Sequence, residues 1–240
     1  MKAILSDIHG NLEALQAVLA DASRQGAHEI YCLGDLVGYG PNPRECVDLA
    51  MHWKLTLLGD FDHEVVQDAT GPGTTVSQAT NFMAWARAQL NAPVPSNQQV
   101  AERWAFLANL PRQLYEGALL FVHGSPRDPL NEYVFPEDIY NQRKMQRIFG
   151  LVEHCCFLGH THVPGIFNEQ PSGDTFPYVF QSPEEFNYVS HLDDRKMICN
   201  VGSVGQPRDS DWRACYVLLD EDTIRFRRVE YDLGKARVEA

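Results

Sequence analysis

The sequence predicts an α/β protein, and two observations support this. Short apolar runs alternate with segments in which apolar residues recur at helical spacing, and polar residues follow most of the runs directly. This strand–loop–helix alternation is typical of a parallel sheet with helices packed on it. A chain of 240 residues is long enough for one sizeable buried core. We therefore expect a single domain over residues 1–240.

The first part of the chain alternates strands and helices. Asn11 is a good N-cap, and apolar residues recur at helical spacing after it until Gly26. A second helix is expected over Pro43–Trp53. The strands are expected at Lys2–Ser6, Glu29–Leu33 and Lys54–Leu58.

The middle of the chain predicts a helical insertion at about 74–110, with helices over Thr74–Leu90 and Gln99–Leu110 separated by a proline-containing linker. A segment at about 167–191 is rich in proline, glutamate and aromatic residues, and we expect it to be a hairpin excursion beside the functional site. The later strands are expected at Ala118–Val122, Cys155–Leu158, Met197–Cys199, Ala214–Leu219 and Thr223–Val229.

Composition and charge exclude several classes of protein. The formal net charge of −12 argues against sequence-independent binding to a nucleic acid duplex, which needs a basic face. No apolar run approaches the roughly 20 residues of a membrane span. The N-terminal segment does not resemble a signal or transit peptide, because Asp7 follows a very short apolar run. We expect a cytoplasmic protein whose six scattered cysteines are reduced core thiols.

Carboxylates follow the early predicted strands, and histidines follow the later ones. In open α/β sheets, ligand sites form where the carboxyl ends of strands meet their loops. One aspartate after a glycine is often only a turn or helix cap, and one histidine near a strand end is often part of the core. The ordered occurrence of all of them favours a site instead. The residues are Asp7, His9, Asp35, Asp60, His123, His160 and His162.

Five segments containing these residues resemble the motifs of the calcineurin-like metallophosphoesterases, in particular a small bacterial branch of phosphodiesterases and serine/threonine phosphatases. The resemblance extends over nearly the whole chain. The segments are Ser6-Asp7-Ile8-His9-Gly10-Asn11-Leu12-Glu13-Ala14-Leu15, Gly34-Asp35-Leu36-Val37-Gly38-Tyr39-Gly40, His123-Gly124-Ser125-Pro126, Gly159-His160-Thr161-His162-Val163-Pro164 and Asn200-Val201-Gly202-Ser203-Val204-Gly205-Gln206-Pro207-Arg208.

This resemblance implies a fold and a metal centre. The fold would be a four-layer α/β/β/α sandwich of two mixed sheets with helices outside. Asp7, His9 and His162 would bind one metal ion, Asp60, His123 and His160 a second, and Asp35 would bridge the two. Mixed carboxylate and imidazole ligands suit Mn²⁺, our first expectation, or Fe, Zn²⁺ or Ni²⁺. A hydroxide bridging the ions would attack phosphorus.

The expected catalytic residues are Asp35, His123, Arg208 and His63. Arg208 and Arg127 lie in loops beside ligands, where each is either a clamp for a phosphate oxygen or a surface arginine paired with a neighbouring aspartate. His63 is either a substitute proton donor or a solvated surface histidine.

The third motif departs from the family's pattern of Gly-Asn-His-Asp/Glu, since the chain has Gly59-Asp60-Phe61-Asp62. With three ionised aspartates, two divalent ions leave a charge of about +1 for the substrate, which disfavours a dianionic monoester. The missing histidine removes the expected proton donor to the leaving group, worth about 10²–10⁴-fold. We expect a preference for phosphodiesters or activated monoesters.

Three alternatives remain open at this point. The same motifs fit a protein serine/threonine phosphatase or a dinucleoside polyphosphate hydrolase, and the aromatic stretch Phe176–Tyr188 would favour the latter if it lined a base-stacking pocket. The altered third motif also fits a metal-binding scaffold with weakened catalysis. The expected partner is a small phosphate ester or a phosphoprotein, with no nucleic acid duplex and no membrane. The sequence does not predict the oligomeric state.

Overall fold

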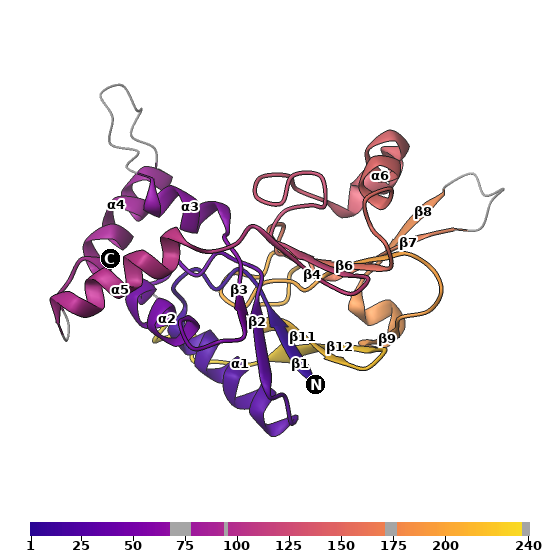
Figure 1. The fold of residues 1–240 in the computed structure, drawn as a ribbon. Coiled ribbons are helices and arrows are strands. Elements are labelled where there is room, and N and C mark those ends of the chain that lie inside the picture. The colour runs from indigo at the N-terminus through magenta and orange to yellow at the C-terminus, as the bar shows by residue number, and fades with distance from the viewer. Residues whose placement is uncertain (68–77, 94–95, 171–176, 237–240) are drawn as a thin grey trace.

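The computed structural model describes residues 1–67, 78–93, 96–170 and 177–236, and two mixed six-stranded sheets dominate it (Figure 1). The β1 sheet has the strand order β3 (Leu55–Thr56), β2 (Glu29–Cys32), β1 (Lys2–Leu5), β11 (Ala214–Asp220), β12 (Thr223–Val229) and β9 (Val189–His191). The β6 sheet has the order β4 (Gln113–Glu116), β5 (Leu119–Val122), β6 (Cys155–Leu158), β10 (Met197–Asn200), β7 (Gly165–Glu169) and β8 (Tyr178–Gln181).

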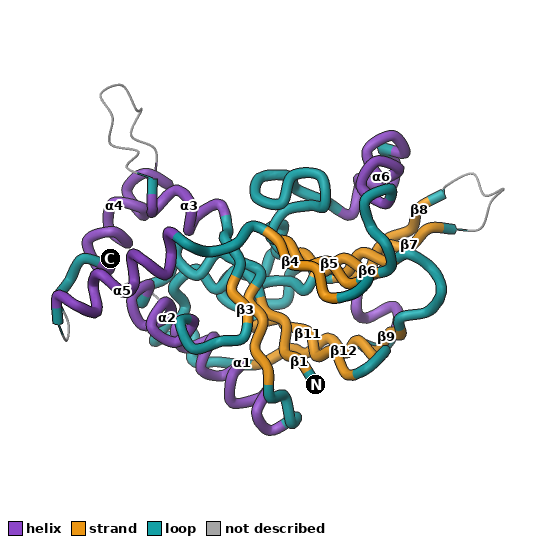
Figure 2. The backbone as a smooth tube through the Cα atoms, in the orientation of Figure 1, coloured by secondary structure: helices purple, strands orange, loops and turns teal. Residues whose placement is uncertain are grey.

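Six α-helices and two short 3₁₀ segments accompany the sheets in the described part of the chain (Figure 2). The helices are α1 (Leu12–Arg24), α2 (Pro43–Ala50), α3 (Asp60–Val66), α4 (Gln78–Leu90), α5 (Asn97–Ala108) and α6 (Gln142–Phe149), and the 3₁₀ segments are η1 (Pro136–Tyr140) and η2 (Pro183–Phe186).

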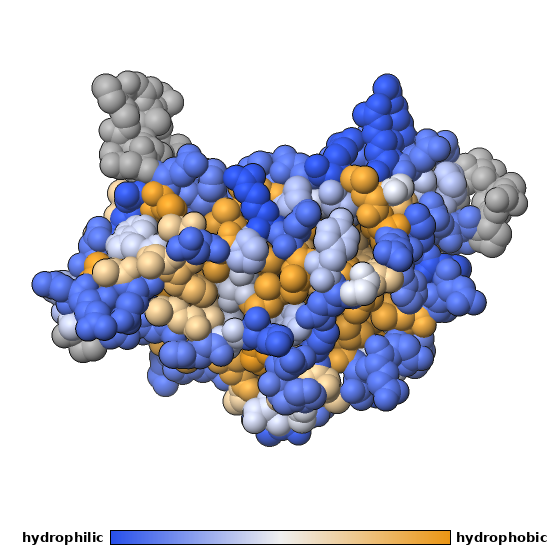
Figure 3. Space-filling model, viewed as in Figure 1, coloured by the Kyte–Doolittle hydropathy of each residue, from blue (hydrophilic) through white to orange (hydrophobic). Residues whose placement is uncertain are grey.

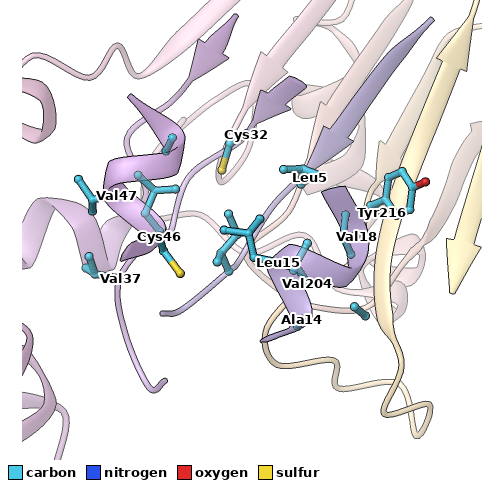
Figure 4. Packing of buried hydrophobic residues seen from close by; sticks show 14 of the residues in the cluster. Leu5, Ala14, Leu15, Val18, Cys32, Val37, Cys46, Val47, Val204 and Tyr216 are labelled. Carbon is cyan, nitrogen blue, oxygen red and sulfur yellow. The ribbon is translucent and has the colours of Figure 1, made fainter. Parts of the chain in front are cut away.

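Alternation of side chains along the strands divides the apolar residues into three cores and confirms the four-layer sandwich. In β1, Ala3 and Leu5 face α1 and α2, while Ile4 faces the other sheet. In β6, Phe157 joins the core between the sheets, and Leu158 packs under α6. Figure 4 shows the first of these cores, where Leu5, Cys32 and Tyr216 of the β1 sheet meet Leu15 and Val18 of α1 and Val47 of α2.

The parallel strands deliver their carboxyl ends to one region. β1, β2 and β3 are mutually parallel, and β5, β6 and β10 are mutually parallel in the other sheet. The loops after β1 and β6 meet, since the His160 backbone N–H donates to Asp7 Oδ2 at 3.0 Å. The expected polar residues at strand ends therefore converge from both sheets.

Helices α4 and α5 lie within the range 74–110 of the expected helical insertion, of which residues 74–77 and 94–95 lie outside the described part. The pair packs on α2 and α3. Arg103 of α5 is almost completely buried and donates to both carboxylate oxygens of Asp48 on α2, at 2.6 and 2.8 Å. This charged pair fixes α5 against α2, the helix that lies between the second and third motifs.

Some elements differ from the sequence prediction. The third strand is shorter than the predicted Lys54–Leu58, because the chain turns toward α3, which begins at Asp60. α3, α6 and β4 have no counterpart among the expected elements. In α6, Met145, Ile148 and Phe149 are buried at helical spacing, but the intervening residues are polar and the helix has only eight residues. So short an apolar pattern is a weak signal in a single sequence.

The described strands of the segment at 167–191 belong to both sheets, and residues 171–176 lie outside the described part. β7 and β8 pair antiparallel at the edge of the β6 sheet, whereas β9 pairs with β12 in the β1 sheet. Phe176 lies outside the described residues. Phe180 packs on Phe167 at 4.8 Å between ring centroids, and Phe186 packs on Phe226 at 5.6 Å. These two rings contact the protein's own core, which weakens the interpretation of this stretch as a base-stacking pocket.

All six cysteines are buried and unpaired, as expected for core thiols, and burial raises the pKa of each. Among the described helices, none has the length and apolar character needed to cross a membrane.

Asp21 of α1 connects the helix to the β1 sheet and gives a test of the fold. It accepts hydrogen bonds from Tyr216 Oη at 2.8 Å and from Arg227 Nε at 3.0 Å. Burial alone would raise the pKa of Asp21, but these hydrogen bonds lower it below its ordinary value. We expect Asp21→Asn to lower the free energy of unfolding at pH 7 by about 2 kcal/mol, because it removes charged hydrogen bonds.

The pH dependence of this effect follows from the direction of the shift. A depressed pKa in the folded state stabilises the protein above the unfolded pKa of about 4, and that stabilisation is lost as the pH falls further. Urea unfolding of the wild type and of Asp21→Asn should therefore differ at pH 7 and converge toward pH 3. Asp232→Asn is the matched control, since its pair with Lys235 is exposed. A difference that persists unchanged at pH 3 would contradict this account.

Candidate metal centre

All seven expected ligand residues lie in two adjacent groups of His and Asp side chains. In each group the potential ligand atoms lie within 4.8 Å of one another, so each group could bind a metal ion. Asp35 faces both groups, with its Oδ2 3.6 Å from His9 Nε2 and 3.7 Å from His123 Nε2. One group contains Asp7, His9 and His162, and the other contains Asp35, Asp60, His123 and His160.

The first group presents three ligand atoms toward a common point. His9 Nε2 lies 3.0 Å from His162 Nε2, and Asp7 Oδ1 lies 3.2 Å from His162 Nε2. The other ring nitrogen of each histidine faces a backbone carbonyl, at Val37 O (3.2 Å) for His9 and at Gln206 O (2.6 Å) for His162. A carbonyl only accepts, so each Nδ1 carries the proton and each Nε2 keeps its lone pair free. This arrangement is typical of metal-binding histidines.

The second group is built in the same manner around Asp60. Its Oδ1 lies 3.0 Å from His123 Nε2 and 3.2 Å from His160 Nδ1, and these two nitrogens are 3.0 Å apart. His160 Nε2 faces the carbonyl oxygen of Asn131 at 3.4 Å. Asp60 is the first residue of α3, where a carboxylate is favoured by the positive end of the helix dipole.

The backbone at these positions is strained. Nine described non-glycine residues have positive φ, and five of them are expected ligands. Such conformations cost about 1–3 kcal/mol each and persist only where the surroundings enforce them. Here the five residues lie in the turns that follow the strands, and these turns hold them in the positive-φ conformation. The ligands concerned are Asp7, His9, Asp35, His160 and His162.

Two glycines allow these loops to approach one another. A Cβ at Gly59 would clash with the backbone and carboxylate of Asp35, and one at Gly159 would clash with Ser6 and Asp7. The loops therefore pack tightly, between the neighbouring strands β2 and β3 at Gly59 and between the two sheets at Gly159, with no room for a larger residue. Both glycines immediately precede an expected ligand.

The residues present fit bound cations. Asp7 Oδ1 and His123 Nδ1 are buried without a hydrogen-bond partner in the described structure. Burial and the nearby carboxylates Asp60 and Asp7 raise the pKa of Asp35 well above its ordinary value. Burial, together with the neighbouring imidazole of His162, lowers the pKa of His9 to about 3, which keeps the His9 ring neutral. A divalent cation in the first group would satisfy Asp7 Oδ1, and cations would offset the repulsion among the carboxylates.

Supporting residues that sequence reasoning missed surround the ligands. Asp62, buried in α3, accepts backbone hydrogen bonds from Val37 (3.1 Å) and Gly59 (3.2 Å), so it joins the second and third motifs. Burial raises the pKa of Asp62 to about 6 in spite of these bonds. Ser203 Oγ donates to the Asp7 carbonyl at 2.8 Å, which gives the late Asn200–Ser203 motif a structural role.

Aromatic rings contact the ligand histidines on two sides. The rings of Tyr39 and Phe61 each lie 4.9 Å from that of His9. On the other side, Tyr133 stacks on His160 with ring centroids 3.7 Å apart. Phe61 also donates its backbone N–H to Asp35 Oδ1 at 3.0 Å. No pattern in the sequence pointed to Tyr133, because it lies in an irregular loop.

The remaining expected catalytic residues lie outside the two groups. Arg208 is exposed and donates to Gln206 Oε1 at 3.1 Å, and its positive charge opposes the rise that burial causes in the pKa of Tyr39. Arg127 pairs with Glu132 and not with a neighbouring aspartate. His63, one turn into α3, forms its described hydrogen bond with Gln67 at 2.9 Å on the exposed side of the helix.

Known proteins share this architecture and sequence. The chain is 34% identical to an uncharacterised protein of Methanocaldococcus jannaschii, over 98% of this chain and 90% of that protein. It is also 34% identical to a metallophosphoesterase of Sphaerobacter thermophilus, whose crystal structure superposes with a TM-score of 0.79 over 98% of this chain and 90% of that one. A hypothetical protein of Pyrococcus horikoshii, 20% identical over 98% of this chain and 90% of that one, shares the fold with a TM-score of 0.69.

A family profile gives the same result for most of the chain. Residues 1–223 match the calcineurin-like phosphoesterase superfamily domain. The match contains both groups of ligand residues, and it confirms the resemblance seen in the motifs. This chain is a member of the calcineurin-like phosphoesterase superfamily.

Proposed function

We propose that this protein is a metal-dependent phosphoesterase that hydrolyses phosphodiesters or activated phosphomonoesters. The observation that carries the proposal is the position of Asp35, whose buried carboxylate faces one histidine of each group, His9 and His123. Asp7, His9 and His162 would bind one ion, Asp60, His123 and His160 the other, and Asp35 both. When bound, such ions supply an activated water and positive charge for the phosphate.

The chain's own residues define what the site accepts. The three ligand aspartates reduce the positive charge that is left for a substrate, so a monoanionic diester is favoured over a dianionic monoester. Phe61 has no proton to give to a leaving group, which favours leaving groups that depart as stable anions. His63 forms its described hydrogen bond on the exposed side of α3 and is a weak candidate for the missing acid.

Arg208 is the candidate for binding the substrate's phosphate. It is exposed, its backbone N–H donates to the carbonyl of the ligand His162 at 3.2 Å, and its charge acts on Tyr39, whose ring lies 4.9 Å from that of His9. A guanidinium at this place can donate two hydrogen bonds to phosphate oxygens. Arg127 is less suited because Glu132 already occupies its guanidinium.

The first test measures metal-dependent hydrolysis of two esters. The protein should bind two transition-metal ions per chain, with Mn²⁺ as the first choice, and hydrolyse bis-p-nitrophenyl phosphate faster than p-nitrophenyl phosphate. Chelation should abolish hydrolysis, and added Mn²⁺ should restore it. Failure to hydrolyse either ester with both ions bound would reject the enzyme and favour a metal-binding scaffold. Turnover of a phosphoprotein alone would favour a protein phosphatase.

Metal removal should also lower stability. Ligands that bind only the folded state stabilise it by RT ln(1 + [L]/Kd), which is about 2.7 kcal/mol at a hundredfold excess over Kd. We expect the melting temperature to fall on chelation and to recover on addition of metal. An unchanged melting temperature at saturating metal would contradict binding at these two groups.

A further inference from the structure

A basic pocket lies beside α6, outside the metal centre. Its volume is about 280 Å³, and we call it the α6 pocket. Strongly hydrophilic residues gather over α6 in the space-filling view (Figure 3). Four of its five lining side chains are cationic, in a chain whose formal net charge is −12. The lining residues are Arg127, Asn141, Arg143, Lys144 and Arg147.

Only part of this positive charge is compensated within the protein. Arg127 pairs with Glu132, and Lys144 pairs with Asp138 at 2.5 Å. Arg143 and Arg147 are exposed, and neither forms an ion pair with a described residue. Being four positions apart, they lie on the same face of α6. The α6 pocket therefore keeps two uncompensated guanidinium groups.

A second pocket of the protein is also lined by arginines, but their charges are compensated. It has a volume of about 400 Å³ and is lined by three arginines together with Tyr188 and Phe226. Every one of these arginines has a carboxylate partner, so this pocket offers an anion little net charge. The pairs are Arg213 with Asp211, Arg227 with Asp21, and Arg228 with Asp209.

The α6 pocket borders the metal centre through one residue. Lys144 Nζ donates to the carbonyl oxygen of Tyr133 at 2.7 Å, and the Tyr133 ring stacks on His160 at 3.7 Å. Arg127, another lining residue of the pocket, lies in the loop that begins at the ligand His123, and its backbone N–H donates to Ser125 Oγ at 3.1 Å. A molecule bound at the metal centre could therefore extend into the pocket over Tyr133.

We propose that the α6 pocket binds a second phosphate group of the substrate, one that is not hydrolysed. The proposal rests on the proposed phosphoesterase function and narrows the substrate to compounds with at least two phosphate groups. Arg143 and Arg147 would donate paired hydrogen bonds to the phosphate oxygens, and Asn141 would donate one more. A nucleic acid duplex is a poor occupant, because the chain as a whole is strongly acidic.

The first experiment measures phosphate binding without turnover. Inorganic phosphate is titrated into the full-length, Zn²⁺-loaded protein in a calorimeter, and the titration is repeated after chelation. We expect the wild type to retain one phosphate site after chelation. The double variant Arg143→Gln/Arg147→Gln should bind phosphate at this site at least about 10-fold more weakly, because charged hydrogen bonds are lost. Arg24→Gln/Arg225→Gln removes the same charge elsewhere on the surface and should bind like the wild type.

The second experiment measures hydrolysis by the same variants. For a p-nitrophenyl ester of a nucleoside bisphosphate, Arg143→Gln/Arg147→Gln should raise KM about 10-fold with kcat nearly unchanged, because it removes uniform binding. Hydrolysis of bis-p-nitrophenyl phosphate, which lacks a second phosphate, should not change. Equal phosphate binding by the wild type and the double variant would overturn the proposal. An unchanged KM for the bisphosphate ester, despite lost phosphate binding, would overturn the assignment to substrate.

The two experiments separate failure of this proposal from failure of the proposed function. If the wild type hydrolyses nothing, the phosphoesterase function fails, while the calorimetric titration still decides whether the α6 pocket binds phosphate. If hydrolysis proceeds normally and the pocket binds no phosphate, only the pocket proposal fails.

Discussion

Asp35→Asn is expected to lower kcat for bis-p-nitrophenyl phosphate by about 10³-fold or more, since a single electrostatic group at a reacting centre is worth about 10²–10³-fold and this one faces both ion sites. Its Oδ2 lies 3.6 and 3.7 Å from one histidine of each group. The variant should also bind less than two ions per chain. Metal content by atomic emission and steady-state hydrolysis measure the two effects.

The variant should fold, which separates lost chemistry from lost structure. Burial and neighbouring carboxylates raise the pKa of Asp35, so a neutral amide removes repulsion from the metal-free protein. Asn also retains an oxygen for the Phe61 N–H, which donates to Asp35 Oδ1 at 3.0 Å. The chelated variant should therefore melt at or above the temperature of the chelated wild type.

Asp222→Asn is the matched control. This carboxylate is 68% exposed in the turn before β12, and its replacement should change neither hydrolysis nor metal content. If Asp35→Asn retained most of its activity and both ions, the proposed bridging role would be wrong.

The sequence alone predicted the ligand residues and several strands, but it did not predict the whole fold. Strands such as β6 and β12 have the expected bounds because β6 is an unbroken apolar run and the first residues of β12 alternate between buried apolar and more exposed side chains. The ligands could be found because each follows a strand directly, so that its place in the sequence determines its place at the sheet edge. The second sheet and the four layers were expected from the resemblance to the metallophosphoesterase family and not from the spacing of apolar residues.

Features that depend on tertiary packing were not predictable in this way. The stacking of Tyr133 on His160 joins residues in two separate loops, and nothing local distinguishes this tyrosine from the exposed Tyr140. The α6 pocket likewise needs Arg127 from one loop and Arg147 from a short helix with few apolar residues. Asp62 appeared only as the last residue of an altered motif, and its two backbone hydrogen bonds came from the structure.

Phe61→His is expected to restore a proton donor for the leaving group. The Phe61 ring contacts His9 edge-on at 4.9 Å and Tyr39 at 5.0 Å, so a side chain at this position reaches the border of the metal centre. General acid catalysis is worth about 10²–10⁴-fold and matters most for poor leaving groups. We expect kcat/KM for an alkyl phosphate ester to rise about 10²-fold, the lower end of that range, because the loop has not been shaped around a histidine.

The leaving-group dependence is the decisive measurement for this variant. p-Nitrophenolate departs without protonation, so hydrolysis of bis-p-nitrophenyl phosphate by Phe61→His should change by less than about threefold. Phe61→Gln is the matched control, since it is polar and similar in length but carries no transferable proton. Equal gains with Gln and His would attribute the effect to polarity rather than to acid catalysis. No gain on alkyl esters with His would mean that the wild type already protonates the leaving group from another residue, and the inferred preference for activated esters would be wrong.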